Sequence, residues 1–399
     1  LREDIDTINR LVQEFEAELA TLGARVDNLE GRIAFLEDHQ FSTTTKLEGE
    51  AVFGISQEFN NDNEVVFQER VRLNFVSSFT GRDALYTRLD AANAEAFDQI
   101  DQGALTYQTG DTDNDVVLGW LAYYFPIGEK IQVYLPAAFP LWVDFVPSVS
   151  PYFDSFSGAT GSLSSFGESS PIYKIGLPSG GGLGVNFDLT ESIVLSAGYF
   201  GGDSFDPSEG AGLFNGEYSA LGQITWNPFD KLQLAATYVR GYFPDGGIFD
   251  LGVGTENAIQ PYGDTAIETN SYGIEGSYQL SPNIAINAFG MFTDADQLDD
   301  EDSDTDIWSY GVGLAFPDLG KEGNLGGIIV GAQPYVDSCD GGACATDEDD
   351  VALHVEAFYK YQFNDNISIT PGVIYINAPF GDTDNDAGII GSIRTTFTF

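Results

Sequence analysis

The sequence is poor in the residues that usually carry metal and nucleophile chemistry, with two histidines, two cysteines and one methionine among 399 residues. Basic residues are also scarce, 16 Lys and Arg against 62 Asp and Glu, which gives a formal net charge of −46. We expect no nucleic acid as a partner, because phosphate contacts need stripes of Lys and Arg. Peripheral docking on anionic lipid is disfavoured for the same reason.

Long apolar runs are missing as well. None reaches the ~18 residues that a membrane-spanning helix needs, which excludes a helical membrane protein. A transmembrane β-barrel stays possible, since its strands alternate apolar and polar residues. The 13% aromatic content and the 46 glycines indicate strands and turns rather than disorder. The chain starts at Leu1 with no visible signal peptide, so we expect a mature or trimmed chain.

The first forty residues have the spacing of a coiled coil. Apolar side chains fill both seam positions through five heptads: Ile5, Val12, Leu19, Val26 and Ile33 at one, and Ile8, Phe15, Leu22, Leu29 and Leu36 at the other. Such a seam covers only ~2/7 of the helix surface, narrower than a face that packs on a globular core, although that packing is the alternative. We predict that residues 1–40 form a stalk, roughly 55 Å long, that associates with parallel copies.

From Phe41 onward the apolar period changes to two, the period of β-strands. Arg70 and Arg72, for example, alternate with Val71 and Leu73. Sixteen such segments begin near residues 43, 65, 84, 115, 130, 182, 192, 216, 231, 268, 283, 307, 326, 351, 366 and 387. Aromatic residues near strand ends are expected to form a girdle at the membrane interfaces: Tyr123, Tyr124, Phe125, Trp226, Phe229, Phe316 and Phe363.

The connections between these segments alternate between short and long. The long ones are acidic and rich in glycine, and the longest lie near residues 93–114, 139–181, 201–215, 242–266, 293–306 and 336–350. Tight periplasmic turns, long external loops and an even number of strands are typical of transmembrane barrels. We predict an all-β transmembrane barrel of sixteen antiparallel strands over residues 41–399, set in outer-membrane lipid and lipopolysaccharide, with the coiled coil in the periplasm.

The third external connection, residues 139–181, is the longest and is expected to fold into the barrel and narrow an aqueous channel. A plain surface loop is the alternative. The loop carries Asp144, Asp154 and Glu168, and alternation places five basic residues on the inward face: Arg70, Arg72, Arg88, Lys360 and Arg394. We predict that these eight residues form the pore constriction, with a transverse field that sorts small polar solutes. Alternatively, the arginines neutralise acids of the wall such as Glu48, Glu50 and Asp90.

Two acidic runs and a cysteine pair stand in the external loops. Asp-Thr-Asp-Asn-Asp occurs twice and could offer oxygen ligands to Ca²⁺, through Asp111, Asp113 and Asp115 and through Asp382, Asp384 and Asp386. Neither run completes the EF-hand pattern, so a solvated acidic rim that concentrates cations is the alternative. Cys339 and Cys344 are expected to form a small-loop disulfide. Apart from this possible Ca²⁺, we expect no cofactor.

Catalysis has little support in the sequence. His39 ends the coil, and His354 stands between Leu353 and Val355, which would face lipid, so His354 is expected to face the lumen. No motif places a serine nucleophile beside a histidine. We therefore expect a protein that is not an enzyme.

The junction between coil and first strand carries a family resemblance. The runs Leu29–Glu37 (LEGRIAFLE) and Phe41–Glu50 (FSTTTKLEGE) resemble cyanobacterial outer-membrane porins, relatives of the carbohydrate-selective (OprB-like) porin family. The terminal Phe399 resembles the insertion signal of outer-membrane barrels. The resemblance implies a homotrimer that passes small solutes and inorganic ions, with iron uptake often proposed. It also implies an upstream S-layer-homology domain that binds peptidoglycan.

Two functions remain open at this point. The first is a diffusion porin, in which the lumen arginines favour anions and the acidic loops favour cations within about one Debye length, ~8 Å at physiological salt. We expect the loops to dominate and to give a weak to moderate cation preference that fades as salt rises. The second is a structural tether, in which the barrel is an anchor and the stalk links the outer membrane to the cell wall.

Overall fold

The computed structural model describes residues 44–60, 63–97, 101–156, 158–177, 180–298, 303–340, 348 and 350–399, together with isolated positions before residue 30. The chain divides into two units, Leu1–Lys46 and Leu47–Phe399. Among the described residues, no helix has the length and apolar character needed to cross a membrane.

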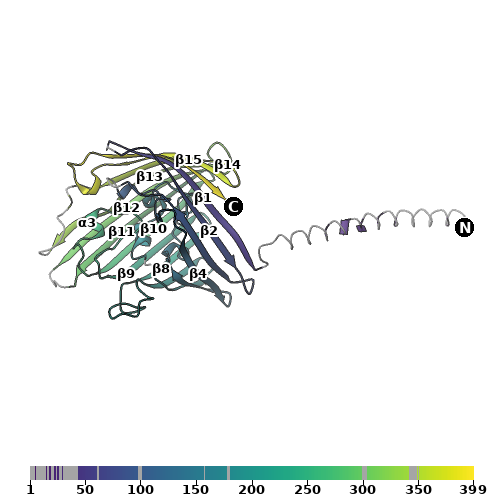
Figure 1. The fold of residues 1–399 in the computed structure, drawn as a ribbon, viewed down its shortest axis with the longest axis horizontal. Coiled ribbons are helices and arrows are strands. Elements are labelled where there is room, and N and C mark those ends of the chain that lie inside the picture. Colours follow the sequence, from purple (N-terminus) through teal and green to yellow (C-terminus); the bar gives the residue numbers. More distant parts are fainter. Residues whose placement is uncertain are drawn as a thin grey trace. The chain divides into compact units, whose positions relative to one another are not determined.

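The second unit is a closed barrel of sixteen strands, as the sequence predicts (Figure 1). Each strand is antiparallel to its neighbours and begins within three residues of the predicted start. The strands are β1 (Thr45–Phe59), β2 (Val66–Ser77), β3 (Ala84–Ala92), β4 (Val117–Ile127), β5 (Ile131–Ala138), β6 (Gly182–Thr190), β7 (Ile193–Gly201), β8 (Tyr218–Phe229), β9 (Leu232–Phe243), β10 (Ile267–Ser281), β11 (Ile284–Gln297), β12 (Asp304–Pro317), β13 (Leu325–Asp340), β14 (Leu353–Asn364), β15 (Ile367–Ile376) and β16 (Gly388–Thr398).

Closure joins the first strand to the last, with Ile55 of β1 opposite Ile393 of β16. These two side chains point outward and are about half exposed, whereas Arg394, the next residue of β16, points inward and is fully buried. Outward apolar side chains continue around the barrel, and the rings of Tyr272 and Phe292 stack on this surface. An apolar outer surface on a closed sheet leaves no unpaired edge, which is the arrangement that a bilayer requires.

Short turns leave the barrel on one side and long connections on the other, which we call the turn side and the loop side. The acidic segment 293–306 differs from the prediction, because β11 continues to Gln297 and β12 begins at Asp304. Asp294 and Asp306 stand opposite each other in this extension. Much of the expected acidic loop is therefore sheet that extends past the outward apolar band.

The third connection, residues 139–181, is named L3 and lies inside the barrel. Trp142, Phe166 and Ile172 of L3 are fully buried. They belong to an apolar cluster that includes wall residues such as Phe200, and the rings of Trp142 and Phe200 stack with centroids 3.9 Å apart. The short helices of the connections are η1 (Asp101–Gly103), η2 (Trp142–Asp144), α2 (Ser165–Glu168), η3 (Pro171–Lys174), α3 (Glu256–Ile259) and η4 (Pro379–Gly381).

Packing of L3 against the wall corrects one part of the predicted girdle. Tyr124 faces the lumen, where its hydroxyl donates to the backbone oxygen of Asp144 at 3.0 Å and its ring lies against Tyr134. Trp226, Phe229 and Phe363 are exposed, as the girdle prediction requires. The difference arises because L3 brings an apolar surface into the lumen, so an inward aromatic residue is as favourable there as an outward one.

One segment of L3 is held by a row of polar side chains from β14, β16 and β1, which we call the L3 clamp. Glu356 accepts hydrogen bonds from the backbone nitrogens of Leu163 (2.7 Å) and Ser164 (3.1 Å) and from the Ser164 hydroxyl. Arg394 donates to the carbonyl oxygens of Gly161 (2.8 Å) and Ser162 (2.7 Å).

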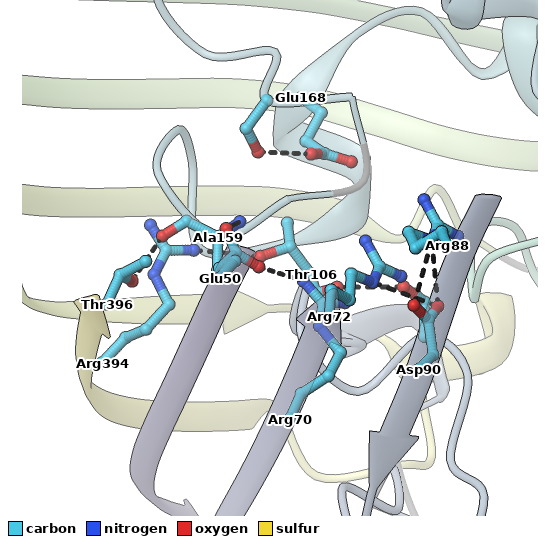
Figure 2. Close-up of polar contacts among 12 residues, drawn as sticks. Glu50, Arg70, Arg72, Arg88, Asp90, Thr106, Ala159, Glu168, Arg394 and Thr396 are labelled. Carbon is cyan, nitrogen blue, oxygen red and sulfur yellow. Dashed lines mark hydrogen bonds and ion pairs between the residues drawn. The ribbon is translucent and has the colours of Figure 1, made fainter. Parts of the chain in front are cut away.

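The clamp continues onto the neighbouring wall (Figure 2). Thr396 donates to the Ala159 oxygen at 2.6 Å, and Glu50 accepts from the Ala159 nitrogen at 2.9 Å. The Glu50 carboxylate also pairs with Arg70 at 3.0 Å. Backbone groups that would otherwise be buried without partners are thereby satisfied.

The opposite wall holds the other part of L3. The Tyr173 hydroxyl donates to Gln223 Oε1 of β8 at 2.9 Å, and the Ser219 hydroxyl donates to the Gly176 oxygen at 2.7 Å. L3 therefore spans the lumen and is anchored on both sides of it.

The described positions before residue 30 are helical, which agrees with the predicted helix at those positions. Five seam side chains are 48–61% exposed in the single chain: Ile5, Phe15, Leu22, Val26 and Leu29. The other seam positions lie outside the described residues, and association between copies stays a prediction.

Replacing Leu22 and Leu29 together with Asp is expected to abolish coil assembly, because charges in the seam cannot be buried against a partner helix. The Ala17→Asp, Ala24→Asp pair changes the same number of charges at outer heptad positions and serves as the control. Chemical cross-linking through the first unit should be lost only in the seam variant, while barrel oligomers weaken but stay detectable on sizing in mild detergent. Unchanged cross-linking in the seam variant would contradict the coiled coil.

Replacing Glu356 with Ala is expected to loosen L3, because three buried donors lose their acceptor at ~1–3 kcal/mol each. The barrel should unfold at a lower temperature, and limited proteolysis should cut within residues 139–181. Glu322→Gln, in the exposed turn between β12 and β13, is the matched control. If E356A keeps the wild-type unfolding temperature and protease resistance, the clamp is not what holds L3.

Candidate functional site

Two cavities lie between L3 and the wall formed by β2, β3 and β4. The loop-side cavity has a volume of about 650 Å³ and is bounded by Arg72, Arg88 and Asp90 of the wall, by Phe139 and Leu141 of L3, and by Asp250. The turn-side cavity has a volume of about 550 Å³ and is bounded by Asn74, Arg82, Tyr86, Arg88, Trp120 and Asp144. Arg88 lines both cavities and marks the boundary between them.

Three charged side chains from adjacent strands meet at that point (Figure 2). Asp90 lies between two guanidinium groups, with Arg88 Nε at 3.0 Å from Oδ1 and Arg72 Nε at 3.3 Å from Oδ2. The three side chains are only 9–13% exposed. Arg88 also donates to the Gly119 oxygen at 2.9 Å and lies over the ring of Trp120. One carboxylate between two guanidinium groups leaves a net positive charge at the boundary between the two cavities.

L3 contributes one carboxylate to the turn-side cavity. Asp144 Oδ2 accepts hydrogen bonds from the Tyr134 hydroxyl at 2.6 Å and from the Leu141 nitrogen at 2.8 Å. Burial raises the pKa of Asp144 to about 6, although these two hydrogen bonds and the nearby Arg88 act in the opposite direction. Its charge therefore changes close to neutral pH.

Asp250 is the corresponding buried carboxylate of the loop-side cavity. Its Oδ2 accepts from the Leu177 nitrogen of L3 at 2.8 Å. Burial, with a smaller effect from Glu217, raises the pKa of Asp250 to about 7. Each cavity thus holds one carboxylate that is partly protonated near neutral pH beside arginines that stay charged.

The structure separates the eight predicted constriction residues into different environments. Arg72, Arg88 and Asp144 border the two cavities. Arg70 and Arg394 are buried and donate to backbone oxygens of the connections, as in the 2.8 Å bond from Arg70 to Thr106. They hold L3 and the β3–β4 connection and do not border either cavity as the structure describes them.

Lys360 and two of the L3 acids lie away from these two cavities, and their part in a constriction stays a prediction. Lys360 is on the inward face of β14 and borders neither cavity in the described part of the chain. Asp154 accepts from the Phe156 nitrogen at 2.7 Å, and Glu168 accepts from the Ser155 hydroxyl at 2.9 Å. Burial lowers the pKa of Lys174, and the nearby Glu168 and Asp154 carboxyls act in the opposite direction.

The alternative role predicted for the arginines, neutralising acids of the barrel wall, is seen at two of these acids. Glu50 pairs with Arg70, and Asp90 pairs with Arg72 and Arg88. Alternation identifies Asp90 from the sequence, since it stands two residues after Arg88 and so shares its face. Asp250 could not be identified in this way, because it lies in a long connection where no periodicity fixes the direction of its side chain.

The predicted Ca²⁺ ligands lie in exposed turns. Asp111 Oδ1 accepts from the Asp113 nitrogen at 3.3 Å, and Asp382 Oδ1 accepts from the Asp384 nitrogen at 2.8 Å. Asp115 and Asp386 are exposed as well. Within the described part of the chain, the carboxylates that do converge are Asp294, Asp296 and Asp304. Calcium at either repeat stays a prediction.

Of the two cysteines of the predicted disulfide, only Cys339 lies among the described residues. Cys339 is disulfide-bonded, and its sulfur lies 2.9 Å from the Thr305 hydroxyl. Cys344 lies outside the described residues, so the pairing stays a prediction.

His354 faces inward, as predicted, and joins several connections to the wall. Its Nε2 lies 3.3 Å from the Ser164 hydroxyl and its Nδ1 lies 3.2 Å from Gln333 Nε2. All three side chains are completely buried. A serine that no solute can reach, and whose hydroxyl already donates to Glu356, holds L3 in place and cannot act as a nucleophile on a solute.

Comparison with solved structures supports the barrel as a porin fold. OprB of Pseudomonas putida superposes with a TM-score of 0.63 at 12% identity, covering 93% of this chain and 97% of that chain. An anion-selective porin from Comamonas acidovorans gives a TM-score of 0.58 at 10% identity, covering 89% of this chain and 99% of that chain. At these identities the likeness concerns the fold.

Sequence relatives come from cyanobacteria. An uncharacterized protein of Nostoc sp. is 44% identical over 425 aligned residues, covering 100% of this chain and 73% of the relative. An uncharacterized protein of Synechocystis sp. is 37% identical, covering 99% of this chain and 76% of the relative. The family described as carbohydrate-selective porin, OprB family, matches residues 2–399. With a family match across nearly the whole chain and a closed sixteen-stranded barrel around L3, the protein belongs to the OprB family of carbohydrate-selective porins.

Proposed function

We propose that the chain is an outer-membrane channel through which small polar solutes and inorganic ions diffuse, with the route passing between L3 and the β2–β4 wall. The observation that carries the proposal is the pair of cavities that meet at Arg88, one on the loop side and one on the turn side of L3. A barrel that served only as a tether would have no use for two cavities, one on each side of L3, that share a charged side chain.

The lining of the route suits small polar molecules. Arg72, Arg88 and Asp90 offer charged donors and acceptors on one wall, while Phe139 and Leu141 of L3 present apolar surface to the same cavity. A pore of this kind recognises solutes that have both a polar edge and a less polar face, such as carbohydrates, and it also conducts ions.

Ion selectivity follows from two opposing sets of charges. The guanidinium groups at the constriction attract anions, while the 62 acidic residues of the chain make the surroundings negative. We propose that the two sets of charges together give a weak cation preference at neutral pH. The charges of Asp144 and Asp250 set part of this preference. The contribution of the exposed loops should fade as salt rises, since charges more than a Debye length away are screened.

We further infer a homotrimer in the outer membrane with the first unit in the periplasm. Support comes from a structural relative, OmpT of Vibrio cholerae, whose trimer form matches with a TM-score of 0.55 at 11% identity, covering 89% of this chain and 99% of that chain. A heptad seam that is half exposed in one chain gives a second reason for copies to associate. Mass photometry in mild detergent tests this, and a monomeric native species would contradict it.

Selectivity is expected to depend on pH because Asp144 and Asp250 lose their protons near pH 6 and 7. Below pH 6 both carboxyls are neutral, the arginines dominate, and the reversal potential in a KCl gradient should shift toward anions. Above pH 7 both carboxyls are ionised, and the reversal potential should shift toward cations. The D144N, D250N double variant should lose most of this dependence, while D384N in an exposed turn should keep it. A wild-type reversal potential that is flat from pH 5 to 8.5 would contradict the assignment.

Substitutions at the constriction should move selectivity in opposite directions. Arg88→Gln removes one positive charge and leaves the Arg72–Asp90 pair, so cation preference should rise. Asp90→Asn leaves two guanidinium groups without their shared carboxylate, so the channel should become anion-preferring. Arg240→Gln, which disrupts an ion pair with Glu268 away from both cavities, is the control. If R88Q and D90N have the same reversal potential, ions do not pass Arg88.

A further inference from the structure

The loop-side cavity has charges of opposite sign on its two sides. Arg72, Arg88 and Asp90 lie on the barrel wall, whereas Asp250 is hydrogen-bonded to the backbone of L3. On the wall, Asp90 neutralises one of the two guanidinium groups, so that side keeps one positive charge. When Asp250 is ionised, the L3 side has one negative charge. The cavity, about 650 Å³ in volume, lies within the range of ~300–1,000 Å³ that is typical of small-molecule sites.

Arg88 offers a donor to an anionic group in this cavity. Its Nε pairs with Asp90, and Nη2 donates to the Gly119 oxygen at 2.9 Å. Its other nitrogen, Nη1, has no hydrogen-bond partner in the part of the chain that the structure describes. The guanidinium is also held over the ring of Trp120. A fixed guanidinium with unused N–H groups is well suited to bind a carboxylate.

Asp250 offers an acceptor on the other side. Its Oδ2 accepts from the Leu177 nitrogen, and its Oδ1 has no hydrogen-bond partner among the described residues. Burial and Glu217 raise the pKa of Asp250, and the hydrogen bond from Leu177 acts against them without help from a described basic side chain. A half-buried carboxylate in such surroundings is stabilised by a cation, and an ammonium group supplies both the charge and the donors.

The remaining lining of the cavity is largely apolar. Phe139 and Leu141 come from the start of L3, Leu177 comes from near its end, and Leu251 directly follows Asp250. Phe139 and Leu251 have φ angles of 49° and 60°, in the left-handed region that bulky residues rarely adopt. Such backbone strain persists where the surrounding structure imposes it, and it is common at ligand sites. These side chains suit a ligand with a hydrocarbon body.

The charges of the cavity discriminate between classes of solute. A simple anion would pair with Arg88 but would also meet Asp250 and a further acid of the lining, Asp111. A simple cation would pair with Asp250 but would meet the two guanidinium groups of the wall. A neutral polyol would leave the charges on both sides without a partner. A molecule with one carboxylate and one ammonium group satisfies both sides, because specificity follows from the unfavourable contacts of the other solutes as well as from its own pairs.

We propose that the loop-side cavity binds zwitterionic α-amino acids with apolar side chains, such as leucine, on their way through the channel. The carboxylate pairs with Arg88, the ammonium group pairs with Asp250, and the side chain packs against Leu141 and Leu251. This site rests on the proposed channel function and deepens it by naming a class of solute.

The test is isothermal titration calorimetry of the whole protein in detergent micelles. The ligands are leucine, 4-methylpentanoate, which lacks the ammonium group, 3-methylbutylamine, which lacks the carboxylate, and glucose. Wild type should bind leucine saturably and each of the other three at least tenfold more weakly, since each analogue loses a charge-assisted hydrogen bond and glucose loses both.

Binding of leucine should also release a proton. The ammonium group lowers the pKa of Asp250 from about 7, so the carboxyl ionises as leucine binds at pH 6.5. Titration in two buffers of different ionisation enthalpy measures this release, and affinity should rise by up to about eightfold from pH 6 to 7.5. The other charged groups that line the cavity or act on Asp250 are Arg72, Arg88, Asp90, Asp111 and Glu217.

Two variants assign the two charged ends of the ligand. Asp250→Asn keeps an acceptor for the Leu177 nitrogen, so it should bind leucine at least tenfold more weakly, without proton release, and should bind 4-methylpentanoate no more weakly than wild type does. Arg88→Gln should weaken leucine at least tenfold and should not weaken 3-methylbutylamine. Asp245→Asn changes an exposed acid of the same connection that lines neither cavity, and it is the matched control.

The outcomes separate the site from the channel. A wild type that conducts KCl in planar bilayers but binds no leucine, or binds glucose or 4-methylpentanoate as tightly as leucine, would overturn the site and leave the channel. The same holds if D250N keeps the wild-type affinity for leucine and the proton release. The ligand series on wild type decides the question even where a variant fails to fold. A wild type that binds leucine and does not conduct would overturn the channel.

Discussion

The constraint on which the structure depends is that a loop placed inside a barrel must have its backbone polar groups satisfied there. Residues 159–164 of L3 meet Glu356, Arg394 and Glu50, which supply acceptors to backbone nitrogens and donors to carbonyl oxygens. Each unpaired group would cost on the order of 1–3 kcal/mol. Because these partners lie on β14, β16 and β1, they fix which side of the lumen L3 occupies and leave the two cavities beside β2–β4.

Alternation and connection length were enough to predict the barrel. The start of β6 at Gly182 and the start of β3 at Ala84 agree with the predicted positions, since each strand follows a clear change from glycine-rich or turn sequence to period two. The prediction of a loop at the acidic segment 293–306 was wrong, because it relied on composition alone. Asp residues disfavour strands only weakly when both strands of a hairpin continue together, as β11 and β12 do.

The direction of each wall side chain could be predicted, but its role could not. Arg72 and Arg394 share the same pattern, an arginine on the inward face of an alternating strand, yet Arg72 borders a cavity and Arg394 is buried under Gly161 and Ser162. The difference depends on where L3 runs, which no local pattern reports. Likewise the rule that inward residues are polar fails at Tyr124 and Phe200, because L3 brings its own apolar surface to meet them.

Net charge is therefore a poor guide to what an ion meets in this barrel. A chain with a formal charge of −46 places two guanidinium groups around one carboxylate at the boundary between its two cavities. Asp154 and Glu168, which are predicted to reach the constriction, border neither of these cavities, and their charges act on buried Lys174 within L3. Desolvation holds Asp144 and Asp250 close to their midpoints at neutral pH. The field along the route is thus set by a few partly buried groups and their protonation, because low-dielectric surroundings strengthen near charges while water and salt screen the many distant ones.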